Sequence, residues 1–499
     1  MDRPTLNTHR ALAMALYATV ANANGLTAQA RDRAATLSSS QRTAIDSFVL
    51  RTMQSRRIPG VAVAVVHDGA VVYRKAFGVA NLETETPLSV NSVFELASVT
   101  KQFTAAAIMM LVEEGKLRLD ASITTYIDSA PPTWSPITVR HLLTHTSGIF
   151  AGGIVRHQGS PLLAVTTKQA FQFVAAQRVF PPGDVGFYSD AGYFLLGMII
   201  EKASGQTYRE FLQRRIFGPL QMTQSSITDR RRVIKGRVST YEIADSNLVN
   251  WRRDWDYELP SFFGIWSTLD DVAKWDTALR RKTLLSQTSL DQMWTPAKLN
   301  DGRDALVDSR LYGFGFRLGE IRGHPVVSHT GASGTLLLHL LDEPLTIIVL
   351  TNLSNTAGRH GTILGNGIVG LLRPAYTPVQ KLAVQPDAIP ETSRALQTLV
   401  TDIAADRESP VMTAAHATYF RRLPSVARDP LRNQLAGLSS LSFVACDDVD
   451  GKGIRVTDPI SRICYYRARS AAGRMVYFTF WLTRDGKAAH MRLAGEDEY

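Results

Sequence analysis

Strand-like segments stand at both ends of residues 40–373, and helix-like segments fill the middle. Near the start, residues 61–66 and 71–77 are apolar, β-branched runs on either side of an Asp-Gly turn, which is typical of an antiparallel hairpin. Near the end, three further runs of this kind cover residues 326–329, 335–341 and 345–350. This order predicts an α+β fold, with one antiparallel sheet flanked by helices and a helical insertion.

Four segments predict the helices around this sheet. Residues 39–57 carry apolar side chains at helical spacing and end at Ile58-Pro59-Gly60. Residues 191–203 are strongly apolar, and residues 267–279 follow Ser267 or Thr268 as N-cap. Residues 361–372 supply the closing helix of this part of the chain.

The sequence divides into four predicted parts. Residues 1–30 form an export signal, residues 31–375 the main domain, residues 376–391 a proline-rich linker, and residues 392–499 a small α+β domain. Within the last part we expect helices over 393–405 and 410–420 and strands over 442–446, 463–469, 475–482 and 489–493.

The N-terminus has the features of a secretory signal. Arg3 and Arg10 precede an apolar run over 11–21, and Ala28-Gln29-Ala30 offers the small residues that a signal peptidase favours. We expect cleavage near Ala30 and a periplasmic or secreted protein; the alternative is an amphipathic N-terminal helix. No apolar run is long enough to be a transmembrane segment.

Composition limits the partners. The chain of 499 residues has a net charge of +10, but its basic residues are scattered in small groups without a recognition motif, so we expect no nucleic-acid partner. Its two cysteines, Cys446 and Cys464, fit no zinc pattern. They either form a disulfide, worth about 3 kcal/mol by loop entropy, or remain buried free thiols.

The segment Ser98-Val99-Thr100-Lys101 opens an apolar run that predicts a buried helix. Side chains three apart share one helix face, so the Ser98 hydroxyl and the Lys101 amine would lie side by side. An amine in a partly desolvated pocket titrates lower and can take the serine proton, and a helix N-terminus favours an oxyanion beside the serine. Alone, the motif fits equally well an N-cap followed by a solvated lysine.

Other motifs narrow the chemistry. Tyr188 lies in a loop just before the apolar segment 191–203, where its ring either faces a cleft or packs on that helix. His141 and His145 are four apart, but no glutamate stands between them as a zinc hydrolase needs, so we interpret them as core or capping residues. The G-x-S-x-G, H-E-x-x-H and phosphate-binding motifs are absent from the sequence.

Together these motifs resemble the serine β-lactamase and penicillin-binding-protein superfamily, in particular its class C β-lactamase-like branch, which includes esterases, D-aminopeptidases and carboxypeptidases. The resemblance covers about residues 40–373. It rests on S-x-x-K at 98–101, HLLTHTSG at 141–148, PPG at 181–183, Tyr-Ser-Asp at 188–190, AGYFLLGMIIEKASGQ at 191–206 and His-Thr-Gly at 329–331.

The resemblance implies a β-lactamase/transpeptidase-like fold and a role for each motif. Ser98 would form an acyl-enzyme, with Lys101 and Tyr188 as the acid-base pair. The backbone N–H groups of Ser98 and Ala332 would form the oxyanion hole. Asp190, His329, Thr330 and Gly331 would bind substrate, and neither a metal nor a cofactor is required.

Two residues depart from the family pattern. Asp190 stands where relatives usually have asparagine, and an ionised carboxylate cannot donate a hydrogen bond to a substrate carbonyl; it can pair with Lys101 or accept from a substrate N–H. His329 replaces a lysine that would bind a substrate carboxylate, and histidine is mostly neutral at pH 7. Both changes favour a permissive esterase or amidohydrolase over a dedicated β-lactamase.

The sequence therefore predicts an exported serine hydrolase that cleaves an ester or amide in a small-molecule or peptide substrate. The alternative from another class is a penicillin-binding sensor or an inactive scaffold. Among enzymes, a class C-type β-lactamase and a D-Ala-D-Ala carboxypeptidase remain alternatives. The oligomeric state is left open.

Overall fold

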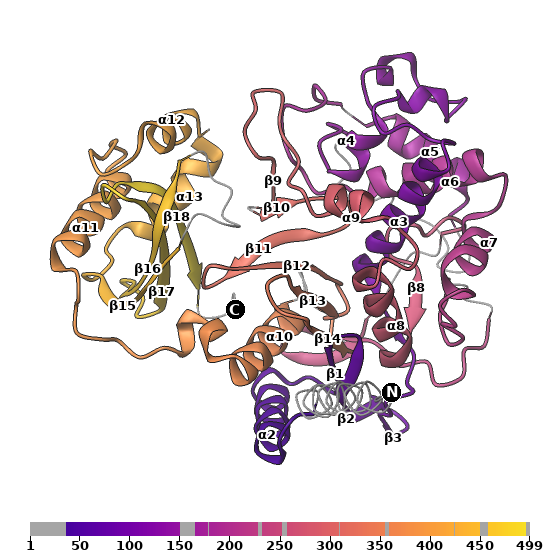
Figure 1. The fold of residues 1–499 in the computed structure, drawn as a ribbon, viewed down its shortest axis with the longest axis horizontal. Helices are drawn as coiled ribbons and strands as arrows, with labels where there is room; N and C mark the ends of the chain where they lie inside the picture. The colour runs from indigo at the N-terminus through magenta and orange to yellow at the C-terminus, as the bar shows by residue number, and fades with distance from the viewer. Residues whose placement is uncertain are drawn as a thin grey trace, which may run out of the picture.

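A computed structural model describes residues 36–149, 165–177, 179–227, 232–251, 257–308, 310–354, 359–423, 425–449 and 458–495. The predicted export signal lies outside these residues. Within them, none of the helices combines the length and the apolar character that crossing a bilayer requires. Figure 1 shows a larger unit that carries the first strands and a smaller C-terminal unit beside it, drawn in orange and yellow.

A nine-stranded antiparallel sheet forms the centre of the larger unit, in the order β3-β2-β1-β14-β13-β12-β11-β10-β9. Strand β1 pairs with its hairpin partner β2 and also with β14, so the two ends of this unit meet in the sheet. The strands are β1 Gly60–His67, β2 Ala70–Asn81, β3 Thr86–Pro87, β9 Leu306–Val307, β10 Arg310–Tyr312, β11 Arg317–Ile321, β12 His324–Thr330, β13 Leu336–Leu340 and β14 Leu345–Thr351. The predicted fold class is confirmed; β9 to β11 were not predicted.

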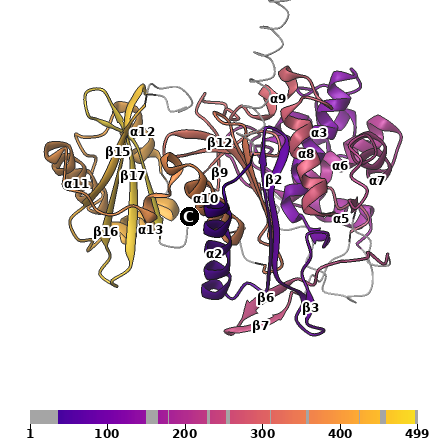
Figure 2. The same cartoon turned by 60° about the horizontal axis from the view of Figure 1, so that its bottom comes forward.

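Helices cover both faces of this sheet (Figure 2). Helices α2 (Ser39–Arg56) and α10 (Arg359–Leu372) lie on one face, where alternate strand residues such as Val63, Leu338 and Val349 are buried. The other face packs against α3 (Thr100–Glu113) and α8 (Leu269–Arg280). Because strand side chains alternate between faces, one sheet serves two hydrophobic cores.

The helical insertion lies between the two groups of strands along the chain, as predicted. It contains α4 (Val139–Leu143), α5 (Thr167–Ala175), α6 (Asp190–Ser204) and α7 (Tyr208–Leu212). Helix α6 is buried along most of its length and contacts α3 directly. Two small sheets and one helix complete the unit. The three-stranded sheet has the order β4 (Phe94–Glu95), β8 (Ile265–Ser267), β5 (Ser226–Ile227), the two-stranded sheet consists of β6 (Tyr241–Ala244) and β7 (Asn247–Asn250), and the helix is α9 (Gln287–Met293).

The C-terminal unit is a four-stranded antiparallel sheet packed against helices. Its elements are α11 Pro390–Ala404, α12 Ala414–Arg422, α13 Ser425–Leu435, β15 Ser442–Asp448, β16 Ile460–Arg469, β17 Met475–Thr483 and β18 Ala488–Gly495. Cys446 and Cys464 lie opposite each other in β15 and β16 and form a disulfide with a sequence separation of 18. The disulfide alternative is confirmed, and α13 was not predicted.

The segment between the two units is ordered and in contact with both. Tyr376 is buried, stacks on His324 and donates a hydrogen bond to Asp342. On the other side of the junction, Trp481 Nε1 donates to Glu320 over 2.9 Å. The predicted linker therefore packs against its surroundings, and the domain boundaries stay a prediction.

Candidate active site

Ser98 lies in a 3₁₀ turn, Ala97–Val99, that runs directly into α3. The preceding residue, Ala97, has φ +47°, a left-handed conformation that costs energy for any residue with a Cβ atom. The hydroxyl of Thr100 accepts a hydrogen bond from the Ile265 N–H at 3.1 Å and ties this turn to β8. The strained turn leaves Ser98 partly exposed at the end of an otherwise buried helix.

Lys101 is fully buried and uses all three of its N–H donors. Its Nζ lies 3.2 Å from Ser98 Oγ, 2.7 Å from Asp190 Oδ1 and 2.9 Å from the carbonyl oxygen of Phe262. Asp190 is the first residue of α6 and is about one third exposed. The structure thus places the predicted nucleophile and amine in hydrogen-bonding contact and adds a carboxylate.

The carboxylate changes the protonation of the amine. Burial lowers the pKa of Lys101, but the charges on Asp190 and Tyr188 and their hydrogen bonds raise it, and the resulting pKa is above its ordinary value. The prediction that this amine titrates lower is therefore wrong, because the ion pair with Asp190, one of the two roles predicted for that residue, outweighs desolvation. At neutral pH Lys101 carries a positive charge in the free protein.

Tyr188 completes the group. The Nζ atom of Lys101 lies 4.8 Å from the centroid of the Tyr188 ring. The guanidinium of Arg317, on β11, lies 5.4 Å from the same centroid. The ring is partly exposed and lies near two cations, one on α3 and one on β11.

His145 holds the Tyr188 segment in place, a role that the sequence did not reveal. Its carbonyl accepts from the Phe187 N–H at 2.9 Å, and its Nδ1 accepts from the Ser189 N–H at 3.1 Å. Its ring centroid is 4.5 Å from that of Tyr188. Burial lowers the pKa of His145 well below its usual range, so it stays neutral and accepts this hydrogen bond. His141 caps α4 through its Nδ1, so both histidines have the structural roles predicted.

The His-Thr-Gly motif ends β12 beside the Ser98 turn. A Cβ atom on Gly331 would come within 2.4 Å of the Leu96 carbonyl and 3.1 Å of the Ala97 Cβ, so only glycine permits this approach. The next residue, Ala332, is partly exposed. In the described part of the chain its backbone N–H donates to no protein acceptor. This N–H is therefore available near Ser98.

His329 is placed differently from the expectation of direct substrate contact. It is 1% exposed, and Thr330 is also buried. Burial lowers the pKa of His329 well below its usual range, so the ring is neutral. Its Nδ1 then donates to the Thr330 carbonyl, and its Nε2 accepts from the Tyr312 hydroxyl, both at 2.8 Å. With both nitrogens engaged, His329 supports Tyr312 behind the Tyr188 ring.

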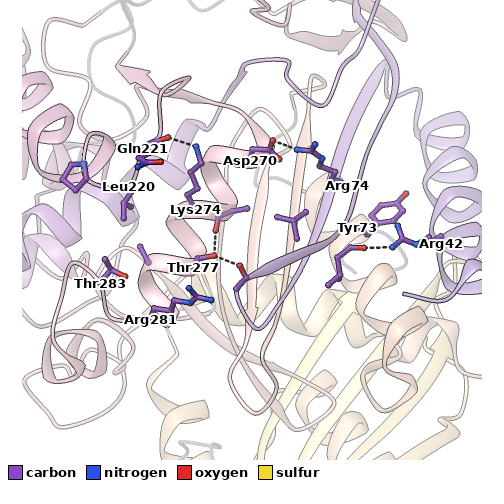
Figure 3. Close-up of a pocket in the computed structure, with 16 residues that line it drawn as sticks. Arg42, Tyr73, Arg74, Leu220, Gln221, Asp270, Lys274, Thr277, Arg281 and Thr283 are labelled. Atoms are coloured by element: carbon purple, nitrogen blue, oxygen red, sulfur yellow. Dashed lines mark hydrogen bonds and ion pairs between the residues drawn. The ribbon is translucent and has the colours of Figure 1, made fainter. Parts of the chain in front are cut away.

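A large hollow elsewhere on this unit is a poor candidate for the reaction. It has a volume of about 910 Å³ and lies between α8 and the β1–β2 turn (Figure 3). Several of its polar groups are paired: Arg74 with Asp270, Lys274 with the Gln221 carbonyl, and Thr277 with the Gly69 carbonyl. No hydroxyl among the residues that line it stands beside a free base, so Ser98 remains the candidate nucleophile.

Comparison with known proteins agrees with this geometry. The family model described as Beta-lactamase matches residues 45–365, which include Ser98, Lys101, Tyr188 and Asp190. The chain belongs to the β-lactamase family. Its membership in the serine β-lactamase and penicillin-binding-protein superfamily, predicted from the motifs, is confirmed.

Several curated members of this superfamily are similar in sequence. Penicillin-binding protein 4* of Bacillus subtilis (strain 168) is 30% identical over 58% of this chain and 67% of its own length. D-aminopeptidase of Brucella anthropi is 27% identical over 66% of this chain and 63% of its own length. Protein flp of Staphylococcus aureus (strain MRSA252) is 28% identical over 46% of this chain. The chain spans 47% of the length of that last protein.

Solved structures share the fold. An octameric penicillin-binding protein homologue from Pyrococcus abyssi has a TM-score of 0.58 at 24% identity and covers 91% of this chain and 98% of its own. EstCE1, a hydrolase with promiscuous acyltransferase activity, has a TM-score of 0.57 at 21% identity and covers 67% of this chain and 100% of its own. The first likeness extends beyond residues 45–365, into the C-terminal unit.

Proposed function

We propose that this member of the β-lactamase family is a serine hydrolase that cleaves an ester or amide through an acyl-enzyme on Ser98. The observation that carries the proposal is the meeting of three groups: the Ser98 hydroxyl, the Lys101 amine 3.2 Å from it, and the Tyr188 phenol packed against that amine. A weak nucleophile is activated when a proton acceptor lies within hydrogen-bond reach.

Acylation would proceed by attack of Ser98 Oγ on the substrate carbonyl carbon. As the new C–O bond forms, the Ser98 proton passes to Lys101 in its neutral form, and Lys101 returns a proton to the Tyr188 oxygen after Tyr188 has protonated the leaving group. The backbone N–H groups of Ser98 and Ala332 stabilise the negative charge on the carbonyl oxygen. Tyr188 then protonates the leaving alcohol or amine as its bond to the carbonyl carbon breaks.

Deacylation would reverse the roles. Tyr188 takes a proton from a water molecule, whose oxygen attacks the acyl carbon, and the bond to Ser98 Oγ breaks as that oxygen regains its proton through Lys101. The product is a free acid. No metal or cofactor takes part in these steps.

Asp190 directs the choice of substrate. Its carboxylate accepts hydrogen bonds and pairs with Lys101, so it offers no donor to a substrate amide carbonyl. We therefore place small esters and amides above β-lactams. A panel of p-nitrophenyl acetate, D-alanine p-nitroanilide and nitrocefin tests this order: the ester should turn over fastest, and nitrocefin hydrolysis at the highest rate would contradict it.

Replacing Asp190 with asparagine should move the acid limb of the pH–rate profile to lower pH by about one unit or more. The active form requires Lys101 to have lost a proton, and Asp190 raises the pKa of Lys101. Without the carboxylate, the effect of burial is larger, and Lys101 loses its proton at lower pH. The profile of kcat/KM between pH 5 and 10 measures this shift. The control is Asp128→Asn, which changes an exposed carboxylate and should leave the acid limb where it is. An acid limb that also stays unchanged in Asp190→Asn would show that Asp190 does not set the protonation of Lys101.

A second candidate is a penicillin-binding protein that acylates without turnover. Its support is the 30% identity with Penicillin-binding protein 4* of Bacillus subtilis over 58% of this chain. Intact-mass spectrometry after mixing with benzylpenicillin distinguishes the two. A stable adduct without ester turnover supports the second candidate; rapid ester turnover supports the first.

We also propose that the protein is exported, to the periplasm or the medium. The run over residues 11–21 supports export, as does the Cys446–Cys464 disulfide, because such bonds persist in oxidising compartments. N-terminal sequencing of the protein from the periplasm or medium of an expressing cell should begin just after Ala30. Protein found only inside the cell, with its first residues intact, would contradict export.

A further inference from the structure

A second cavity, of about 740 Å³, lies between the two units. The larger unit contributes residues of β11, β12 and β13 beside α10, including Val326 and Leu338, together with Asn366 of α10 itself. The C-terminal unit contributes α12, β17 and β18, through residues such as Ala415 and Trp481. Its volume lies within the range typical of sites that bind small molecules.

This cavity begins beside the candidate active site. Arg317 lines it and also covers the Tyr188 ring at 5.4 Å. Leu306 lines it and also touches the loop before Tyr188, since a Cβ atom on Gly186 would lie 2.5 Å from the Leu306 carbonyl. Ser328 lines it from the strand position next to His329. A chain leaving the carbonyl on the Tyr188 side therefore enters the space between the units.

The walls of this cavity combine apolar side chains with charged ones, among them Arg310, Asp458 and Arg492. Burial lowers the pKa of His490 to about 4 and also lowers that of His416, so both rings are neutral. Burial raises the pKa of Glu320 to about 7, and Trp481 donates a hydrogen bond to that carboxyl. Charged side chains stand at the entrance, where Arg317 pairs with Asp308 and Arg303 with Asp301. The apolar part of the walls, which includes Leu306, Leu338 and Trp481, suits an aliphatic chain, and the charged side chains suit a polar head.

We propose that the cavity between the units binds an extended aliphatic chain of the substrate, so that the C-terminal unit forms one wall of the substrate site. This inference rests on the proposed function and deepens it, because it names the substrate class as esters or amides of a medium-length aliphatic acid or alcohol. The aliphatic chain lies either on the acyl side or on the leaving-group side of the carbonyl. In both arrangements the cavity binds the same kind of group, an unbranched aliphatic chain.

Two substrate series test the proposal and locate the chain. One series lengthens the acyl group of p-nitrophenyl esters from two to eight carbons, and the other lengthens the alcohol of alkyl acetates over the same range. We expect kcat/KM to rise by about tenfold or more along one series, since each buried methylene favours binding. The series that responds identifies the side. A flat response in both series would overturn the proposal while leaving the hydrolase intact.

Two variants tie this response to the cavity. Leu341 lines the cavity and is 44% exposed, so the Leu341→Asp protein should fold. This variant should lose most of the rise in kcat/KM with chain length. The matched control is Leu82→Asp, because Leu82 is 39% exposed and lies outside the cavity. Ala415→Trp fills part of the space, with Ala472→Trp in the β16–β17 turn as its control. Both control variants should keep the wild-type activity on every ester. Equal responses of cavity variants and controls would overturn the proposal.

A binding measurement separates this inference from the proposed function. Calorimetric titration of the Ser98→Ala protein with octanoate and with 1-octanol needs no turnover. We expect at least one to bind, about tenfold more weakly when Leu341→Asp is added. If the wild type hydrolyses no ester, the proposed function is wrong, and the titration alone then shows whether the cavity binds an aliphatic chain. Absence of binding by both compounds would overturn the cavity proposal.

Discussion

Ester hydrolysis should fall by at least about ten-thousand-fold when Ser98 is replaced with alanine, because no other group in this account forms the covalent intermediate. Ser98 is partly exposed and its Oγ contacts only the Lys101 amine in the described residues, so removing the oxygen should leave the fold unchanged. The release of p-nitrophenol from p-nitrophenyl acetate at pH 8 measures the rate.

The matched control for this prediction is Ser135→Ala. Ser135 is exposed and belongs to a 3₁₀ turn of the larger unit. This variant should keep the wild-type rate, and the circular dichroism spectra of both variants should match that of the wild type. Turnover by Ser98→Ala within tenfold of the wild type would remove Ser98 from the mechanism.

The second large effect should come from Lys101→Met, which should lower kcat by at least about a thousandfold. Methionine keeps the length and apolar stem of the buried side chain but cannot pass a proton between Ser98 and Tyr188. Stability should change little by comparison, because the partner left behind, Asp190, is about one third exposed and can be solvated.

Lys202→Met is the control for Lys101→Met. Lys202 lies on α6, as Asp190 does, but its amine is exposed and pairs with Asp128 at 2.7 Å. Its replacement should change neither kcat nor the midpoint of thermal unfolding by a measurable amount. If Lys101→Met retained acylation at the wild-type rate in a stopped-flow burst, the proton would leave Ser98 by another route.

Local patterns predicted the elements that carry the site. The helix predicted over 191–203 differs from α6 by one residue at each end. Its C-terminal end was predictable because Gly205, in the left-handed conformation, ends the helix. Thr268 is the N-cap of α8, one of the two residues named from the sequence. The three strands near residue 340 were also predicted, and two of them, β13 and β14, are buried on both faces along their whole length.

Features that depend on distant contacts could not be predicted. Strands β9 to β11 are short and mixed in polarity, and they exist because β12 offers its edge for pairing. The raised pKa of Lys101 depends on Asp190, 89 residues further along the chain. Likewise, no local signal connects His145 to the backbone of Ser189, or β18 to the cavity beside Tyr188. These contacts arise only when the insertion, the sheet and the C-terminal unit fold together.

Covalent trapping tests the central claim most directly. The wild-type protein is treated with an alkyl fluorophosphonate at neutral pH, its intact mass is measured, and its peptides are mapped. We predict one adduct per chain, carried by Ser98, with none formed on Ser98→Ala under the same conditions. An adduct on any other residue, or no adduct on a folded protein that hydrolyses esters, would contradict the assignment of Ser98 as the nucleophile.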